Sequence, residues 1–435
     1  MKEIRVGAVG VGNIFTHCHL PAYARLPEAK LVAMADPSER SLRRALAAAR
    51  EAFQSEAERL RGEGRDEEAR EMLKAASEIR VYKDYREMLS REEVDLVDIC
   101  TPHKYHKEIA VEALRAGVNV MVEKPMARTY LEALEIVEAA RDSKKLFQLN
   151  ENYVFAGGFY KVRKLIQAGE LGEVCFLIVP CSHEGPEGTE WFWNPELGGG
   201  GALLDLGSHA VAVAWYLIGL DRKPELVKAE KFAGVSLRAR ERYVAGGFKC
   251  ALVEDDAHVL VKFRGTDDSW ATALIEASWC GPEYECTMAF GSRGSLKVRG
   301  AQGKAVVELS DYVGRRRVIE VPQEVSSMDT FTYEIAYMCR CVSSGSRSFL
   351  NEEVGAEVMA VVDAAYYSEM QGRRAVTLDE FKEFSAKLAE RFGDRASDEF
   401  IKMKVRHVAG QLPPREVLAF AAREADSPRL GRDAA

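Results

Sequence analysis

Short apolar runs alternate with longer helical patterns along residues 1–150 of the chain. Between the runs, apolar side chains recur every three or four positions, a spacing typical of helices that cover a sheet. This alternation predicts a parallel, doubly wound sheet, so we expect an α/β domain over residues 1–150. The predicted strands are residues 4–9, 30–35, 94–100, 120–122 and 146–149.

One stretch of this half, residues 38–79, is much longer than a simple crossover between strands needs. Two helical stripes occupy it, and Gly62 and Gly64 interrupt them. The pattern predicts a helical insert at about residues 48–78, in which residues 50–74 form a hairpin with a charged outer face. A solvated decoration, a lid and a contact between subunits are all compatible with this pattern.

In the second half of the chain, strand-like runs follow one another with few helical patterns between them. They predict a mainly antiparallel sheet in a second α/β domain over residues 151–377, followed by a helical extension over 378–435. The expected strands are residues 174–181, 225–232, 257–263, 271–279, 284–290, 295–298, 306–309 and 317–321. The expected helices are residues 158–168, 202–220, 328–342, 353–371 and one around 381–392.

The apolar stretch 202–220 is long enough that a membrane span must be considered. Asp205, Ser208 and His209 in its first half favour a buried helix instead. The composition, 47% hydrophobic and 29% charged, is that of a soluble globular protein. A length of 435 residues exceeds one ordinary core, so two domains are expected.

Charge and cysteine content narrow the range of functions. A net charge of -8 argues against a general nucleic-acid surface. The nine cysteines include no Cys-x-x-Cys pair, and we expect them to be reduced and mostly structural. No secretory segment precedes the first predicted strand, so we expect a cytoplasmic protein.

A glycine turn follows the first predicted strand. Gly10 permits the tight turn, and Gly12 lets the backbone approach a pyrophosphate at the N-terminus of the next helix. The second strand ends at Asp36, which suits a ribose 2′-hydroxyl and repels a 2′-phosphate, so NAD is favoured over NADP. Arg40 is the nearest residue that could neutralise such a phosphate. Phe15 occupies the place of the third small residue, so we expect this helix to lie further from the strand.

The run at residues 120–122 stops at Glu123, Lys124 and Pro125. The carboxyl ends of parallel strands face the crevice where ligands bind, so Lys124 should point into it. Pro125 restrains Lys124 to an extended backbone. The tripeptide alone more often marks the end of a strand with a solvated lysine.

Asp205 and His209 are four residues apart in a predicted helix and should project from one face. A carboxylate beside an imidazole orients it and raises its basicity, which suits a general base. Alternatively, Asp205 caps the helix and His209 is a core histidine. The preceding glycines, residues 198–201, allow the backbone and a ligand to approach closely.

These motifs, taken in order, resemble the Gfo/Idh/MocA family, which includes glucose–fructose oxidoreductase and inositol dehydrogenase. The resemblance covers roughly residues 4–377. It implies a Rossmann domain and an α/β domain with a large, open sheet that often mediates oligomers. The motifs are Gly10-Val11-Gly12-Asn13-Ile14, Cys100-Thr101-Pro102 with His106, Glu123-Lys124-Pro125, and the run from Gly199 to His209.

The resemblance also implies roles for individual residues. Lys124 would hydrogen-bond the reacting hydroxyl or carbonyl, His209 would move the proton, and Asp205 would orient His209. A hydride would pass to or from nicotinamide C4, with Glu123 on the nicotinamide ribose side and no metal involved. The implied cofactor-binding residues are Gly10, Gly12, Asn13, Ile14, Asp36, Thr101, Pro102, His106, Glu123 and Lys124. Alternatively, His106 does no more than begin a helix.

Two departures from the family pattern concern the substrate. Relatives usually carry Trp-Arg where this chain has Trp191-Phe192, and residues 150–155 lack an arginine often found there. Aromatic faces suit the C–H faces of sugars, and polar tips suit their hydroxyls. The candidate pocket residues, each equally readable as a loop or core side chain, are Tyr153, His183, Trp191, Trp193 and Asn194.

Together these features predict an NAD-dependent oxidoreductase that acts on a sugar or polyol. A glycosidase that uses bound NAD for transient oxidation and elimination is a second possibility. A non-catalytic regulator that binds a dinucleotide is a third. We expect a homo-oligomer, a dimer or tetramer, formed through the C-terminal sheet, with no nucleic-acid or membrane partner.

Overall fold

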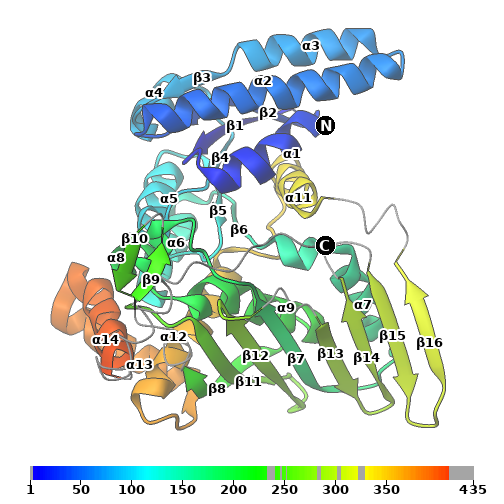
Figure 1. Ribbon diagram of the computed structural model, residues 1–435, viewed down its shortest axis with the longest axis vertical. Coiled ribbons are helices and arrows are strands. Elements are labelled where there is room, and N and C mark those ends of the chain that lie inside the picture. The colour runs from blue at the N-terminus through cyan, green and yellow to red at the C-terminus, as the bar shows by residue number, and fades with distance from the viewer. Residues whose placement is uncertain are drawn as a thin grey trace, which may run out of the picture.

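Two sheets, one above the other in Figure 1, organise the molecule. The computed structural model describes residues 3–232, 241–244, 247–250, 252–281, 286–300, 305–321 and 329–410. Residues 411–435 of the predicted extension lie outside the described residues. The same holds for residues 284, 285 and 328, which begin two of the predicted elements.

The first sheet is parallel throughout and has the strand order β3-β2-β1-β4-β5-β6. Adjacent strands are joined by helices that cover its faces, so the predicted doubly wound Rossmann fold is confirmed. The strands are β1 Ile4–Val9, β2 Ala29–Ala35, β3 Arg80–Tyr82, β4 Leu96–Ile99, β5 Asn119–Glu123 and β6 Phe147–Asn150. The main helices of this half are α1 Leu20–Arg25, α4 Tyr85–Arg91, α5 His106–Arg115 and α6 Tyr130–Ser143.

The helix after β1 accommodates the bulky residue in its fingerprint. Phe15 is fully buried in the core between this helix and the sheet, and its ring lies 6.3 Å from that of Tyr23. The helix makes a π turn, η1, over Phe15–His19 before it continues as α1. The wide turn coincides with the place where the family pattern has a small side chain.

The predicted insert consists of α2, Glu39–Gly62, and α3, Asp66–Ser77, which lie side by side at the top of Figure 1. The first half of α2 buries Ala45, Ala49 and Phe53 in the core that packs on the sheet. Its second half contacts α3 instead, through a small cluster formed by Ala57, Leu60 and Ala69. The part that projects beyond the dinucleotide fold therefore begins after Phe53.

The second sheet has nine strands in the order β16-β15-β14-β13-β7-β12-β11-β8-β17. Only β7 and β12 pair in parallel among its described strands, so the predicted mainly antiparallel, open sheet is confirmed. The strands are β7 Val174–Ser182, β8 Lys223–Phe232, β11 Asp256–Arg264, β12 Trp270–Ser278, β13 Cys286–Gly291, β14 Gly294–Arg299, β15 Val306–Asp311, β16 Arg316–Glu320 and β17 Val376–Thr377.

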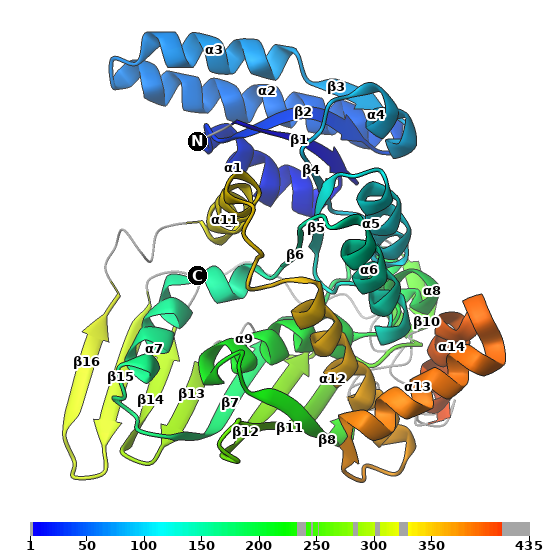
Figure 2. The same cartoon turned by 180° about the vertical axis from the view of Figure 1, so that it is seen from behind.

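Helices lie on the face of this sheet that is turned toward the first sheet (Figures 1 and 2). They are α7 Gly157–Gln167, α9 Ser208–Ile218 and α12 Glu352–Met370. Helix α11, Thr330–Ser344, instead packs beside α1 of the first half. The segment Pro195–Ile218 is long and apolar enough to cross a membrane, but 94% of the residues in its most apolar 18-residue window are buried inside the protein, as in a core helix.

Candidate active site

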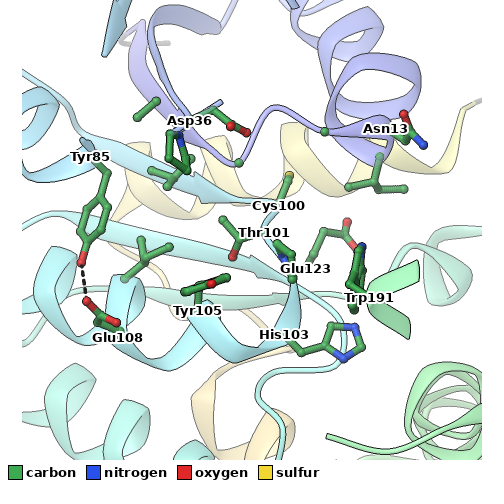
Figure 3. Close-up of a pocket in the computed structure, with 18 of the residues that line it drawn as sticks. Asn13, Asp36, Tyr85, Cys100, Thr101, His103, Tyr105, Glu108, Glu123 and Trp191 are labelled. Carbon is green, nitrogen blue, oxygen red and sulfur yellow. Dashed lines mark hydrogen bonds between the residues drawn. The ribbon is translucent and has the colours of Figure 1, made fainter. Parts of the chain in front are cut away.

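A cavity of about 970 Å³ opens at the carboxyl ends of the first sheet's strands. Residues that follow β1, β2, β4 and β5 form most of its wall, and the loop around Trp191 closes it from the second half. Figure 3 shows Asp36 at one end of this cavity and Trp191 with His103 at the other. The predicted residues that line it are Gly10, Gly12, Asn13, Ile14, Asp36, Thr101, Pro102, Glu123, Lys124 and Trp191.

The two glycines of the turn shape the cavity in different ways. Gly10 has a φ of +84°, and a Cβ there would lie 2.5 Å from Cγ2 of Thr101, so the turn has no room for a side chain. A Cβ on Gly12 would meet nothing within 4 Å, because it would point into the open cavity. The backbone at Gly12 can therefore approach a bound pyrophosphate closely at the start of the following helix, whose first N–H groups have no partners within the helix. The residues present fit a dinucleotide.

Asp36 is held at the rim of the cavity by two backbone groups. Its Oδ2 accepts the N–H of Val11 at 3.0 Å, and its Oδ1 accepts the N–H of Ser38 at 2.8 Å. These bonds fix the carboxylate beside the glycine turn and leave lone pairs on both oxygens for ribose hydroxyls. Arg40 is exposed and does not line the cavity.

Two cations that sequence reasoning missed, Lys83 and Arg86, also line the end of the cavity near Asp36. Both are already paired with acidic side chains. Lys83 Nζ lies 3.6 Å from Glu39, and Arg86 Nη2 lies 2.5 Å from Glu108 and 2.7 Å from Glu112. Each of the two positive charges is therefore already compensated by a carboxylate at the place where a 2′-phosphate would lie.

Lys124 forms an ion pair with Asp205 of the second half. Its Nζ lies 2.6 Å from Oδ1 of Asp205 and donates to the Asp205 carbonyl at 3.1 Å, and the peptide bond to Pro125 is cis. Burial lowers the pKa of Lys124, but the Asp205 carboxylate more than offsets this and leaves the pKa above its ordinary value. The ammonium is therefore charged at neutral pH.

Asp205 is ionised as well. Burial raises the pKa of Asp205, yet the Lys124 ammonium, together with the nearby His183, outweighs burial and holds the pKa below its usual range. Its second oxygen, Oδ2, accepts the indole N–H of Trp279 at 3.0 Å and lies 3.8 Å from His183 Nε2. With these contacts, Asp205 fixes the Lys124 ammonium at the mouth of the cavity.

The prediction that Asp205 orients His209 is wrong. Among the described residues, the hydrogen-bond partner of His209 Nδ1 is Glu151, whose Oε1 lies 2.5 Å away. A π turn, η5, runs over Leu203–Gly207, so α-helical spacing does not relate the side chains at 205 and 209. The ring of Tyr153 stacks on His209 at 4.1 Å and fixes its plane.

Sequence reasoning did not identify Glu151. Its side chain is fully buried, and Oε2 has no hydrogen-bond partner among the described residues. An acid directly after a buried strand, at the carboxyl edge of a parallel sheet, was the available signal. Residues 150–155 lack the arginine of relatives, but this departure did not single out Glu151 in this stretch as the partner of His209.

A second buried network lies behind the cavity wall at Glu123. His19 bridges two carboxylates, with Nε2 2.8 Å from Glu123 and Nδ1 2.8 Å from Asp98, and Tyr23 donates to Asp98 at 2.7 Å. Burial lowers the pKa of His19, but Asp98 raises it further, so the net pKa lies well above the usual value. A charged imidazolium thus holds Glu123 in place.

Glu334 of α11 reaches the same network from the second half. Both of its carboxylate oxygens are buried and have no hydrogen-bond partner among the described residues. Burial, followed by the nearby Glu123, raises the pKa of Glu334 well above its ordinary value, so its protonated, neutral form is favoured. Ligand atoms of His19, Glu123 and Glu334 lie within 4.8 Å of one another, a spacing that could also admit a cation.

His106 does not line the cavity, contrary to the prediction from the family motif. It is fully buried, and its ring nitrogens lie 2.9 Å from the Pro125 carbonyl and 2.8 Å from the Thr101 carbonyl. It therefore ties together the loops after β4 and β5. His103, which sequence reasoning passed over, does line the cavity, and burial lowers its pKa to about 3, so it is neutral.

The five substrate candidates divide into two groups. Trp191 lines the cavity, with its ring stacked on Phe192 at 3.9 Å, while His183 faces Asp205 and Tyr153 covers His209. The other two have structural roles. Trp193 is buried against Trp279, with ring centroids 4.9 Å apart, and Asn194 caps the short helix α8, Pro195–Gly198, by accepting the N–H of Glu196.

The parallel sheet, the glycine turn and a cavity shared by both halves define a two-domain protein of the Rossmann dinucleotide-binding class. More narrowly, the chain belongs to the Gfo/Idh/MocA family of oxidoreductases. The model of its NAD-binding Rossmann domain matches residues 4–151, and the model of its C-terminal domain matches residues 159–305. The resemblance stated from the motifs is confirmed.

Curated relatives in this family include sugar dehydrogenases. D-glucoside 3-dehydrogenase of Escherichia coli (strain K12) is 28% identical over 219 residues, which are 50% of this chain and 55% of that protein. D-xylose 1-dehydrogenase (NADP(+)) of Hypocrea jecorina is 34% identical over 276 residues, which are 61% of this chain and 66% of that protein. The matched part thus spans about half to two thirds of these relatives' length.

Solved structures show the same fold. Levoglucosan dehydrogenase in complex with NADH and levoglucosan superposes with a TM-score of 0.68 and covers 87% of this chain and 100% of its own. The two sequences are 20% identical, so this similarity concerns the fold alone.

Proposed function

We propose that the protein is an NAD-dependent dehydrogenase that oxidises a hydroxyl of a sugar or polyol, or reduces the corresponding carbonyl. One observation carries this proposal. The charged Lys124, paired with Asp205, lies at the end of a cavity whose other end is built for a dinucleotide, and His209 stands beside the same pair. The family and its sugar dehydrogenase relatives support the reaction class.

Each residue has a definite task in this reaction. The Lys124 ammonium donates to the substrate oxygen and stabilises negative charge that develops on it. His209 donates its Nδ1–H to Glu151, so the lone pair lies on Nε2 and can accept the hydroxyl proton. Bound NAD supplies the hydride acceptor. Glu151 stabilises the imidazolium that forms, and Asp205 keeps Lys124 in position.

The substrate is a neutral sugar in this proposal. The arginine that relatives place beside the tryptophan is replaced by Phe192, so no cation for a substrate carboxylate is available there. Trp191 offers an aromatic face in the cavity wall, which suits the C–H face of a sugar ring. His183 adds a polar group near Asp205 for a hydroxyl.

A panel of neutral sugars, sugar acids and aryl glycosides tests the reaction class, with NADH formation and aglycone release followed together. We expect one NADH for each neutral sugar oxidised and weaker turnover of the acids. Release of the aglycone without net NADH would show the redox glycosidase instead. Tight dinucleotide binding without turnover of any substrate would indicate a regulator.

The preferred cofactor in this proposal is NAD rather than NADP. Asp36 presents a carboxylate at the ribose end, and the nearby cations Lys83 and Arg86 are paired with acids. Calorimetric titration with both cofactors should give a clearly lower Kd for NAD. Equal or tighter binding of NADP would remove Asp36 from this role.

We also propose that the protein forms homo-oligomers through the open face of the nine-stranded sheet. Leu260, Leu274, Ile178 and Met288 lie opposite one another on four neighbouring strands and form an apolar row. All four are only half-buried, and no helix of the described residues covers their side of the sheet (Figures 1 and 2). A second copy of the same face would bury this row.

A further inference from the structure

The chain continues beyond the segments that match the family models, and this continuation folds back toward the site. Helices α13, Leu378–Phe392, and α14, Ala396–Gly410, form a unit at the edge of the molecule (Figure 2). Helix α14 contacts α6, α8 and α12. These three helices border the loops that hold Lys124 and the glycine tract.

Lys404 of α14 carries its charge into the interior, where its side chain is 3% exposed. Its Nζ lies 2.6 Å from Oδ1 of Asp363 and donates to the carbonyl of Gly199 at 3.3 Å. It also lies over the rings of Tyr366 at 4.4 Å and Phe400 at 4.9 Å. A buried ammonium with this set of partners joins the extension to α12 and to the glycine tract.

The partners of Lys404 are themselves connected to the helix that bears Asp205. The Tyr366 hydroxyl donates to Glu254 at 2.6 Å. Glu254 in turn accepts the N–H of Gly201 at 3.1 Å and that of Leu203 at 3.0 Å, two residues before Asp205. These contacts fix the start of the helix, where three of the four preceding residues are glycines with little rigidity of their own.

A second set of contacts connects the extension to the loop after Lys124. Arg128 Nη2 lies 3.1 Å from Asp398, and the hydroxyls of Thr129 and Ser397 are 2.8 Å apart. The loop and the glycine tract also touch directly, because a Cβ on Gly199 would lie 2.6 Å from that of Arg128. The extension therefore contacts both segments that place Lys124 and Asp205 opposite each other.

We propose that Lys404 is a positioning residue, which holds the glycine tract against the loop after Lys124 and thereby sets the geometry of the Lys124–Asp205 pair. Its catalytic effect rests on the proposed dehydrogenase function. Without the ammonium, Gly199 loses its donor and the Asp363 carboxylate is left buried beside the tract. A displacement of about 1 Å at the reacting groups can cost on the order of 10²-fold in rate.

Kinetics of Lys404→Met test this role. We expect kcat to fall about tenfold or more, with the NAD Kd changed less than about twofold, because the cofactor half of the cavity is untouched. Lys404→Arg should recover part of the loss because it keeps the charge. Lys402→Met, a change to an exposed lysine on the same helix, should have no effect.

Leu388→Ala provides the control for stability, because Leu388 is buried in α13 and has none of the site contacts described above. If Lys404→Met and Leu388→Ala lower Tm equally and also lower kcat equally, Lys404 is merely structural and the proposal is wrong.

Hydrogen exchange gives a readout that does not depend on turnover. Lys404→Met should speed exchange in residues 199–206 relative to Leu388→Ala, and Lys402→Met should not. Unchanged exchange in this segment would overturn the proposal whatever the activity. If the wild-type protein turns over no sugar and Lys404→Met still speeds exchange, the positioning role stands and the proposed dehydrogenase function is wrong.

Discussion

Lys124 keeps its charge at the end of a buried strand because Asp205 lies 2.6 Å away across the domain boundary. Desolvating two charges is costly, and such pairs contribute little net stability. The pair is better understood as a way to fix the ammonium in one position, since Asp205 is itself held by Trp279. His209 is fixed in the same manner by Glu151 and Tyr153.

Lys124→Met and His209→Ala should each lower turnover by about 10²–10⁴, the usual loss for a positioned acid–base group. Most of the NAD affinity should remain, because the glycine turn and Asp36 are unchanged. Steady-state kinetics with calorimetric NAD titration measure both quantities. Lys107→Met, a change to a surface lysine paired with Glu135, is the matched control. Full activity in both active-site variants would contradict the shared mechanism.

Glu151→Gln and Asp205→Asn separate the two assignments of the residue that orients His209. An amide at 151 can donate to Nδ1 and favour the other tautomer, so turnover should approach that of His209→Ala. Asp205→Asn should act through Lys124, and a further Lys124→Met change should then add little. Normal turnover in Glu151→Gln would return the orienting role to Asp205.

The raised pKa of Glu334 predicts a pH-dependent stability. In the native protein Glu334 stays protonated above the ordinary pKa of a glutamate, whereas in the unfolded chain it releases its proton near pH 4.5. The native state then binds more protons, so the free energy of unfolding falls as pH rises, by at most about 1.4 kcal/mol per pH unit. Glu334→Gln removes this loss, and the Tm advantage of this variant over the wild type should grow as the pH rises above the ordinary pKa of a glutamate. A constant Tm difference would show that Glu334 is ionised or compensated in the native state.

At the scale of elements, spacing along the chain identifies the helices better than it identifies side-chain neighbours. Apolar periodicity and two glycines were enough to predict the α2–α3 hairpin, because α2 buries one regular stripe and α3 packs on it through Ala69. The same reasoning failed for Asp205 and His209, since the π turn η5 has no recognisable signal in the sequence. Asp36 lies in the cavity wall, at the predicted end of the second strand, because that position depends only on where one strand ends.

Deleting the projecting part of the hairpin, residues 54–74, and closing it with a short turn should leave the NAD Kd within about twofold. Phe53 must be retained, because it packs in the core between α2 and the first sheet. Calorimetry and the sugar panel measure cofactor binding and turnover separately. Lost turnover with intact cofactor binding would indicate a lid or a subunit contact instead of a decoration.

At the scale of the whole molecule, the site exists only where the two halves meet. The first half supplies Lys124, the segment that joins the halves supplies Glu151, the second half supplies Asp205 and His209, and α11 returns to place Glu334 beside Glu123. The extension adds Lys404 from more than two hundred residues beyond the glycine tract. Long-range packing of this kind leaves no local pattern.

Leu274→Glu should shift the protein toward the monomer, because it places a charge in the centre of the apolar row on the open face of the sheet. Light scattering at several concentrations measures the change in mass. Glu276→Gln, a change on the same strand that adds no charge, is the control. A wild-type protein that is monomeric at all concentrations would contradict the proposed interface.

The sequence by itself determined most of the strands and helices, the glycine turn with Asp36, and the position of Lys124 at a strand end, but not the short strands β3 and β17. Each of these depends on short-range periodicity or on backbone conformation, which neighbouring residues impose. Only the tertiary structure decided that Asp205 pairs with Lys124, that Glu151 holds His209, and that His106, Trp193 and Asn194 have structural roles. These pairings depend on distances between segments far apart in the chain, which packing of the two sheets fixes.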